Sequence, residues 1–186
     1  TTETLSQGTT VNYYYENTAG DLEGKLLTVD VLNDSDQVIM RARYVYKSPA
    51  LTESDLGITG DLIQVTIMRR VSDTTVDDPT EGNDPDGTNA DDHFSIKKVT
   101  QYRYHADSKM KLVLENGDVE RILSDSGALS DPEDILDEAD DYTVAGGKDI
   151  EDYASRSYTY HASDNNTGAS QATAWGSENL QTKYGG

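Results

Sequence analysis

The sequence predicts an all-β protein in which antiparallel β-hairpins repeat to form an extended, spiralling or solenoid-like sheet. Tyrosine pairs separated by one residue recur along the chain, and their four segments hold nine of its twelve tyrosines. The pairs are Tyr13 with Tyr15, Tyr44 with Tyr46, Tyr102 with Tyr104, and Tyr158 with Tyr160. Hydrophobic residues make up only 34% of the chain, which suits a thin sheet better than a deep core.

The spacing within each pair indicates a strand. Successive side chains in a strand point to opposite faces, so two tyrosines separated by one residue lie on the same face. Each ring supplies apolar area, while its hydroxyl reaches water or a backbone group. The repeated pairs therefore predict repeated strands, each with tyrosines along one face.

The first two pairs are followed by further strand patterns. Residues 25–32 and 38–44 are predicted strands, and the polar residues 33–36 between them form a turn. After the second pair, residues 61–70 alternate between apolar and polar side chains, as in a half-buried strand. The first half of the chain is thus a series of strands joined by turns.

The third pair leads to predicted strands at residues 110–114 and 119–123. Asn116 and Gly117 between them favour a hairpin turn, because both accept positive φ. The fourth pair is followed by a polar turn at 163–168 and a weak strand from Gln171 to Trp175. A further tyrosine, Tyr184, resembles the start of a fifth repeat. The chain starts with Thr1 and carries no signal-peptide pattern, so we expect either a processed mature protein or a piece of a longer chain.

Two acidic insertions interrupt the repeats in what we expect to be a single domain over residues 1–186. Residues 73–92 hold eight acids and no base, and residues 130–152 hold ten acids and one base. Ser130 and Glu133 have capping-box spacing, and Pro132 suits the first turn of a helix. The second insertion therefore predicts one short helix near residues 131–139.

The run from Asp84 to Asp92 alternates oxygen-bearing side chains around Gly87. A hard cation such as Ca²⁺ takes six to eight oxygen ligands from a flexible turn, so calcium is a candidate cofactor. The candidate ligands are Asp84, Asp86, Asn89, Asp91 and Asp92. No bidentate Glu follows at the twelfth position, so the run is no EF-hand. A solvated acidic loop and a calcium site both remain open as interpretations.

Charge and motifs exclude several classes of function. The formal charge of −20 repels phosphate backbones, so we expect no nucleic-acid partner. No stretch of about 18 apolar residues occurs, so we expect no membrane insertion. The chain has no cysteine, and it lacks His-Glu-x-x-His, Gly-x-Ser-x-Gly and phosphate-loop motifs. We therefore predict that it is no enzyme.

The segment Thr100–Val119 combines a Tyr-x-Tyr pair, an Asp turn, a Leu/Val strand and a second turn. In this it resembles the RHS/YD-repeat family, as do residues 11–46 and, more weakly, residues 157–184. Where that family usually has Asp after the second tyrosine, this chain has Glu16, Lys47, His105 and His161. The resemblance implies β-hairpins wound into a long spiralling sheet, as a hollow shell in polymorphic toxins or a barrel-like body in some cell-surface proteins.

The expected function is structural. Unpaired strand edges are templates for pairing with another copy, so we expect an extracellular or cell-surface protein that forms a homopolymeric fibre or sheath. Calcium bound at the acidic run would stabilise such an assembly. The alternatives are an adhesin or carbohydrate-binding module whose tyrosine-rich face binds glycans, and a fragment of a larger RHS shell protein.

Overall fold

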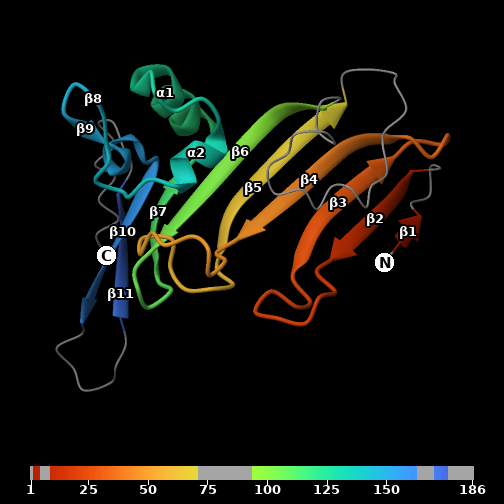
Figure 1. The fold of residues 1–186 in the computed structure, drawn as a ribbon, viewed down its shortest axis with the longest axis horizontal. Helices are drawn as coiled ribbons and strands as arrows, with labels where there is room; N and C mark the ends of the chain where they lie inside the picture. The colour runs from red at the N-terminus through yellow and green to blue at the C-terminus, as the bar shows by residue number, and fades with distance from the viewer. Residues whose placement is uncertain (1, 5–8, 71–93, 163–169, 176–186) are drawn as a thin grey trace. The chain divides into compact units, whose positions relative to one another are not determined.

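The computed structural model describes residues 2–4, 9–70, 94–162 and 170–175 (Figure 1). These residues form mostly antiparallel β-sheet, and only one of their α-helices exceeds five residues. The all-β class is therefore confirmed. A spiralling or solenoid-like course of the sheet remains a prediction.

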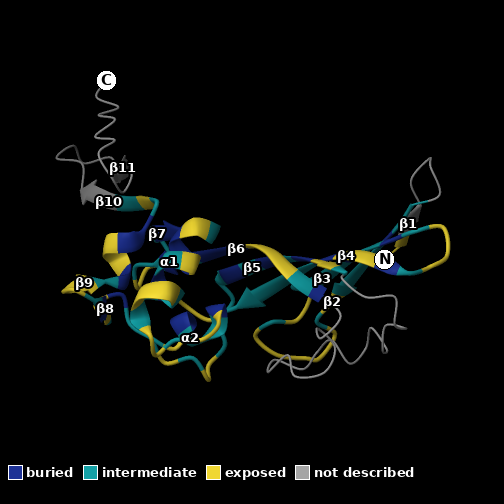
Figure 2. Cartoon of the chain, turned by 90° about the horizontal axis from the view of Figure 1, so that it is seen from above, coloured by how far each residue is buried: buried dark blue, intermediate teal, exposed yellow. Residues whose placement is uncertain are grey.

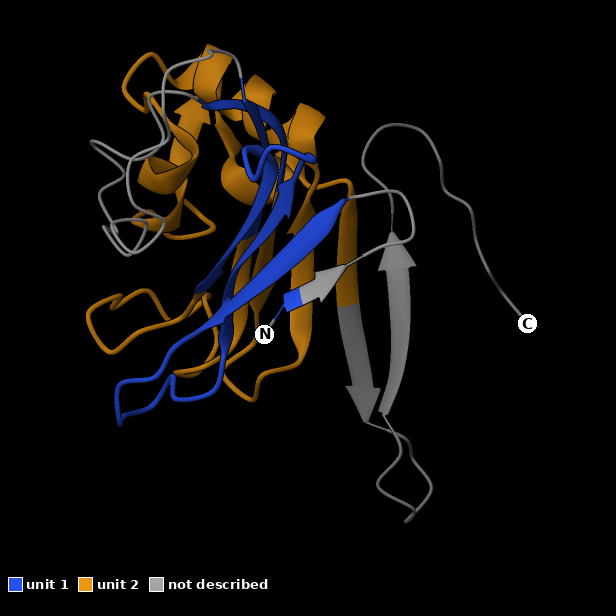
Figure 3. Cartoon of the chain, turned by 90° about the vertical axis from the view of Figure 1, so that its right-hand side faces the viewer, with its two compact units in different colours: residues 1–45, 65–99 blue, residues 46–64, 100–186 orange. Residues whose placement is uncertain are grey.

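The chain divides into two compact units (Figure 3). The first unit comprises residues 1–45 and 65–99, and the second comprises residues 46–64 and 100–186. Strands β5 (Leu62–Arg70) and β6 (Phe94–Tyr104) each contribute residues to both units. The division thus passes through strands and not through linkers, and the expected single domain stays a prediction.

The first unit is a meander of antiparallel strands in the order β1-β2-β3-β4-β5-β6. Its first four strands are β1 (Thr2–Thr4), β2 (Thr10–Tyr15), β3 (Leu26–Leu32) and β4 (Val38–Tyr46). The strands predicted at residues 25–32, 38–44 and 61–70 are therefore confirmed to within two residues at each end.

The predicted turn at residues 33–36 is also confirmed. The Asn33 side chain accepts hydrogen bonds from the N–H groups of Ser35 and Gln37, each at 3.0 Å. Asp36 adopts a left-handed conformation with φ of 58°, which Asp tolerates better than most residues. Local side-chain bonds of this kind explain why the turn was readable from sequence. Beside it, Leu32 and Val38 pack with Met68 and Phe94 in a small core. Figure 2 shows dark-blue buried stretches in β5 and β6.

The second unit continues with the strand order β6-β7-β10-β11 and adds helices. Its strands are β7 (Met110–Leu114), β10 (Arg156–Ala162), β11 (Ser170–Trp175) and a separate pair, β8 (Thr143–Ala145) with β9 (Lys148–Asp149). Its helices are α1 (Asn116–Ser126), α2 (Pro132–Leu136) and a 3₁₀ turn, η2 (Ile150–Tyr153). The strands predicted at 110–114 and 171–175 are confirmed.

The hairpin turn predicted at residues 115–118, with a returning strand at 119–123, is wrong. These residues belong to α1, and Gly117 does not adopt positive φ. The Asp118 carboxylate instead accepts the N–H of Glu115 at 2.8 Å, which caps the start of the helix. Val119 and Ile122 lie three residues apart and are both buried, so the segment buries apolar area as a helix.

The short helix predicted near residues 131–139 is confirmed as α2, with its cap one residue later than expected. Asp131, and not Ser130, is the N-cap, and its side chain accepts the N–H of Asp134 at 3.1 Å. Pro132 takes the first helical position, as predicted. Hydrogen bonds from Ser130 and then from the Asp131 N–H lower the pKa of Asp134.

All four tyrosine pairs lie in strands, namely β2, β4, β6 and β10. After three of them, the next residue donates its N–H to the residue just before the following strand: Glu16 to Lys25, Lys47 to Asp61, and His105 to Lys109, at 2.8 to 2.9 Å. The repeat visible in the sequence is therefore also a repeat of backbone hydrogen bonding. Tyr184 lies outside the described residues.

Candidate functional site

The sequence-predicted calcium ligands cannot be placed. Asp84, Asp86, Asn89, Asp91 and Asp92 all lie outside the described residues, as does the whole insertion 73–92. Within the described ranges, no group of three or more His, Asp or Glu side chains is arranged to hold a metal ion. Calcium binding at this run stays a prediction.

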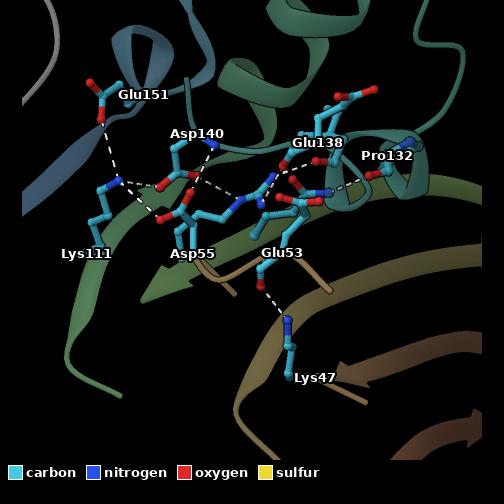
Figure 4. Close-up of polar contacts among 11 residues, drawn as sticks. Lys47, Glu53, Asp55, Lys111, Pro132, Glu138, Asp140 and Glu151 are labelled. Atoms are coloured by element: carbon cyan, nitrogen blue, oxygen red, sulfur yellow. Dashed lines mark hydrogen bonds and ion pairs between the residues drawn. The ribbon is translucent and has the colours of Figure 1, made fainter. Parts of the chain in front are cut away.

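A cluster of charged residues with a buried centre lies in the second unit, and sequence analysis did not predict it. We call it the Arg103 cluster; it comprises Arg103, Lys111, Asp140, Asp55 and Glu151 (Figure 4). Arg103 comes from β6 and Lys111 from β7. The three carboxylates come from the loop before β5, the loop after α2, and η2. Carboxylates from distant parts of the chain thus surround the positively charged side chains of Arg103 and Lys111.

Arg103 is the centre of the cluster and is fully buried. Its guanidinium donates to the backbone carbonyls of Ile135 and Glu138, and its Nε lies 3.4 Å from Asp140 Oδ1. The two carbonyls lie at the end of α2 and just beyond it, where a helix leaves acceptors unsatisfied. Arg103 therefore holds the end of α2 against β6.

A neutral pair of side chains holds the other end of α2. Gln101 is fully buried on β6 and donates to the Pro132 carbonyl and to the Gln64 side chain. Gln64 in turn donates to Glu133 at 2.9 Å. Gln101 and Arg103 are separated by one residue, so both side chains lie on the face of β6 that the helix covers. That face is opposite the tyrosines of the same strand.

Lys111 reaches the cluster because of a β-bulge. Arg103 pairs with Leu112 and Tyr104 pairs with Met110, so the register skips Lys111. A bulge leaves one residue unpaired and redirects its side chain. Lys111 Nζ lies 2.7 Å from Asp140 Oδ2, 3.6 Å from Asp55 Oδ1 and 3.7 Å from Glu151 Oε2.

Burial and charge compete in the cluster, and the balance differs between partners. The pKa of Asp140 is raised because burial outweighs the opposing effects of Arg103 and Lys111. Burial alone would lower the pKa of Lys111, but the hydrogen bond and charge of Asp140, together with Asp55 and Glu151, raise it. Burial determines the shift of Asp140 but not that of Lys111, because the Asp140 side chain is 2% exposed and that of Lys111 is 25% exposed. Burial also lowers the pKa of Arg103, against the carboxylates of Asp140 and Asp55.

Two sequence signals could have indicated the cluster. Arg103 stands between two tyrosines, where the other pairs have Tyr14, Val45 or Thr159. Lys111 interrupts the otherwise apolar strand Met110–Leu114. A charged residue at such positions needs a buried partner. The sequence could not identify Asp140 and Asp55 as those partners among 35 acids.

The first unit has a second unusual feature, on β2, β3 and β4. Directly paired residues share a face, and one face carries two apolar rows. The rows are Val11, Val31 and Met40, then Tyr13, Val29 and Ala42; we call these six residues the Val31 face. Met40 is 44% exposed, and Tyr13, Val29, Val31 and Ala42 are half-buried.

The opposite face of the same strands carries a charged pair at its centre, beside the buried Leu32 and Val38. Asp30 and Arg41 form a two-point ion pair at 2.8 and 3.0 Å, and the two residues are 0% and 3% exposed. The guanidinium also lies 5.1 Å from the centre of the Phe94 ring. At this central pair, the charged residues are therefore more buried than the apolar residues of the Val31 face, which is the reverse of the usual pattern.

Comparison with protein-family models, curated proteins and solved structures finds no match to this chain. The resemblance to RHS/YD repeats rests on the tyrosine motifs alone. Among the described helices, none is long and apolar enough to cross a membrane.

Proposed function

We propose that the protein is a structural subunit, extracellular or at the cell surface, whose copies assemble into a fibre or sheath by pairing of strand edges. The observation that carries this proposal is strand β11. Its six residues, Ser170–Trp175, include no charged residue and no proline, in a chain of which 27% is charged. Natural edge strands usually carry charges, prolines or bulges that block pairing with another chain.

The pairing of β10 and β11 supports an available edge. Within the described part of the chain, β11 has one neighbouring strand, β10, to which it pairs at six positions. β10 pairs with β7 at only two positions, Arg156 and Ser157, and continues to Ala162. The hairpin therefore extends beyond the β7 ladder, and in the described part of the chain no second strand pairs with β11, which leaves an edge of the kind that accepts a further strand.

The ends of the strand orders also favour an open assembly. β1 stands at the end of the order in the first unit, and β11 at the end in the second. Pairing of β1 in one copy with β11 in another uses two different surfaces. Contacts of this heterologous kind produce filaments unless their rotation closes a ring.

An adhesin or glycan-binding module is the second candidate, and the Val31 face favours it. Half-exposed apolar residues on an ordered sheet form a surface on which a partner or sugar ring can stack. Tyr15, at the end of β2, is 40% exposed. A monomer that binds glycans through this face would replace the assembly proposal.

The substitution Thr173→Lys tests the assembly proposal, because it places a charge in the middle of β11. A matched control is Thr18→Lys, which makes the same change in net charge at an exposed loop position. We expect filaments by electron microscopy and large species by sedimentation velocity for the wild type and for Thr18→Lys. Thr173→Lys should remain monomeric, with unchanged circular dichroism.

A wild-type protein that stays monomeric at high concentration would refute the proposal. Filaments formed equally well by Thr173→Lys would show that β11 is not the interface. Adding a chelator tests the calcium prediction separately: loss of filaments that calcium restores, but not in an Asp84→Ala, Asp86→Ala variant, would assign the ion to the acidic run.

A further inference from the structure

The Arg103 cluster brings the amine of Lys111, whose side chain is 25% exposed, into contact with a buried carboxylate. Lys111 Nζ lies 2.7 Å from Asp140 Oδ2, and the Asp140 side chain is 2% exposed. Lys111 is the unpaired residue of the bulge in β7, and Asp140 follows α2. The contact therefore joins a strand to the helical segment, across 29 positions of sequence between residues 111 and 140.

A third group touches both members of this pair. Asp55 Oδ1 lies 3.6 Å from Lys111 Nζ, and Asp55 Oδ2 accepts the backbone N–H of Asp140 at 3.3 Å. Asp55 can therefore take a proton from the ammonium, while the backbone N–H of Asp140 holds its other oxygen beside the reacting pair. On the other side, the Arg103 Nε lies 3.4 Å from Asp140 Oδ1, where it stabilises negative charge on that oxygen.

We propose that Lys111 and Asp140 condense to form an intramolecular amide cross-link. A C–N bond forms between Lys111 Nζ and Asp140 Cγ, and one C–O bond of Asp140 breaks. The ammonium supplies three protons: one remains on the amide nitrogen, and two leave with the oxygen as water. No oxidant, reductant or cofactor is needed, and the net charge does not change.

Asp55 and Arg103 have different roles in this step. Asp55 is the catalytic residue that moves the proton, because it contacts the reacting amine. Arg103 holds Oδ1 while the tetrahedral intermediate carries charge there. Burial raises the pKa of Asp140, which favours the neutral acid from which water can leave.

Burial also supplies a driving force. A buried ion pair bears a desolvation cost that its mutual attraction does not always offset. Condensation replaces the ammonium and the carboxylate by a neutral amide, whose oxygen can accept from Arg103. The guanidinium keeps its bonds to Ile135 and Glu138, and the carboxylate of Asp55 remains near it.

The chain contains a matched pair that should not react. Lys109 Nζ lies 2.5 Å from Asp107 Oδ2, but the two side chains are 43% and 54% exposed. Water solvates both charges there, so this pair does not bear the desolvation cost of a buried ion pair. The same two residue types in contact thus differ in burial and in the presence of Arg103 and Asp55. This inference does not depend on the proposed assembly.

Intact-mass spectrometry of the folded wild-type protein tests the cross-link. We expect a mass lower than that of the linear sequence by one water molecule. Digestion with trypsin should leave the bond after Lys111 uncut and yield a branched peptide that contains Lys111 and Asp140. A folded wild type with the full linear mass would overturn the proposal.

Variants separate this cross-link from loss of water elsewhere. Lys111→Arg should have its full linear mass, whereas the control Lys109→Arg should keep the deficit. Asp55→Asn retains both reacting residues and should show the full mass, or acquire the deficit at least tenfold more slowly. Asp140→Asn should still form the amide, with loss of ammonia in place of water. A deficit that persists in Lys111→Arg would assign the lost water to another site and refute the proposal.

Discussion

The hairpins β2–β3 and β6–β7 share one backbone design and differ in what their side chains do. Each follows a tyrosine pair, and each has a register shift at the second tyrosine of the pair. The shift skips Leu27 in β3 and Lys111 in β7. The residues before the second tyrosine are Tyr14 and Arg103. The position of the bulge is therefore the same in both repeats, whereas the side chains at the bulge differ with the local packing.

The difference follows from what covers each hairpin. In β6–β7, Arg103 and Lys111 meet the carbonyls and carboxylate of the segment that follows α1. In β2–β3, the equivalent Tyr14 and Leu27 are neutral and half-buried. Charged residues at the bulge thus accompany the helical insertion. Polar contacts from Arg103 and Lys111 therefore hold the inserted helical segment at this one hairpin.

Of the substitutions considered, removal of Arg103 should lower the free energy of unfolding the most. Arg103→Ala leaves Asp140 paired on one side only and removes the donors to two buried carbonyls, at an expected cost of about 5 kcal/mol. Tyr14→Ala changes the equivalent position of the other hairpin and should cost about 1–2 kcal/mol, because Tyr14 is only half-buried. Urea unfolding followed by circular dichroism measures both.

Hydrogen exchange sharpens the same test. In Arg103→Lys, which keeps the charge but loses the planar fork, exchange should rise first in residues 132–140. Equal destabilisation by Arg103→Ala and Tyr14→Ala would show that Arg103 does not stabilise the α2 segment beyond ordinary packing.

The buried ion pair of the first unit should respond differently to single and double substitution. Arg41→Ala leaves the fully buried Asp30 without this partner and should cost about 3 kcal/mol. Combining Arg41→Met with Asp30→Leu removes both charges and should restore most of that stability. Denaturant midpoints of Arg41→Met, Asp30→Leu and the double variant give the coupling. A double variant that is less stable than both single variants would contradict this account of the pair.

Sequence predicted the strands well and the buried contacts poorly, for physical reasons. Alternation and turn residues act locally, so the strand Met110–Leu114 and the turn at Asn33 were readable from a few residues. The helix α1 was missed because Asn116-Gly117 favours a hairpin, whereas the burial of Val119 and Ile122 and the contact of Asp118 with Ser155 depend on tertiary packing. The Arg103 cluster joins residues 55 to 151, and no local pattern records such distant partners.

The smallest expected effects lie in the two loops that close the hairpins. Hydrogen bonds from Thr18 lower the pKa of Glu16 from its ordinary value of 4.5. In the shorter loop, the hydrogen bond and charge of Lys109 lower the pKa of Asp107 from 3.8. A carboxyl whose pKa is lower in the folded state stabilises the fold above its unfolded pKa. It loses that contribution as the pH falls through the folded pKa.

Titration by NMR should therefore place both carboxyl pKa values below their ordinary values, and the two loops should differ in their response to salt. Glu16 is held by a backbone N–H, so its pKa should change little between low and high salt. Asp107 is held by an exposed ammonium, so screening should move its pKa toward 3.8.

The control variants Thr18→Ala and Lys109→Met separate the two causes. Thr18→Ala keeps the backbone donor, so most of the Glu16 shift should remain, whereas Lys109→Met should abolish most of the Asp107 shift. If Thr18→Ala instead abolished the Glu16 shift, the backbone N–H of residue 18 would not be what lowers the pKa of Glu16.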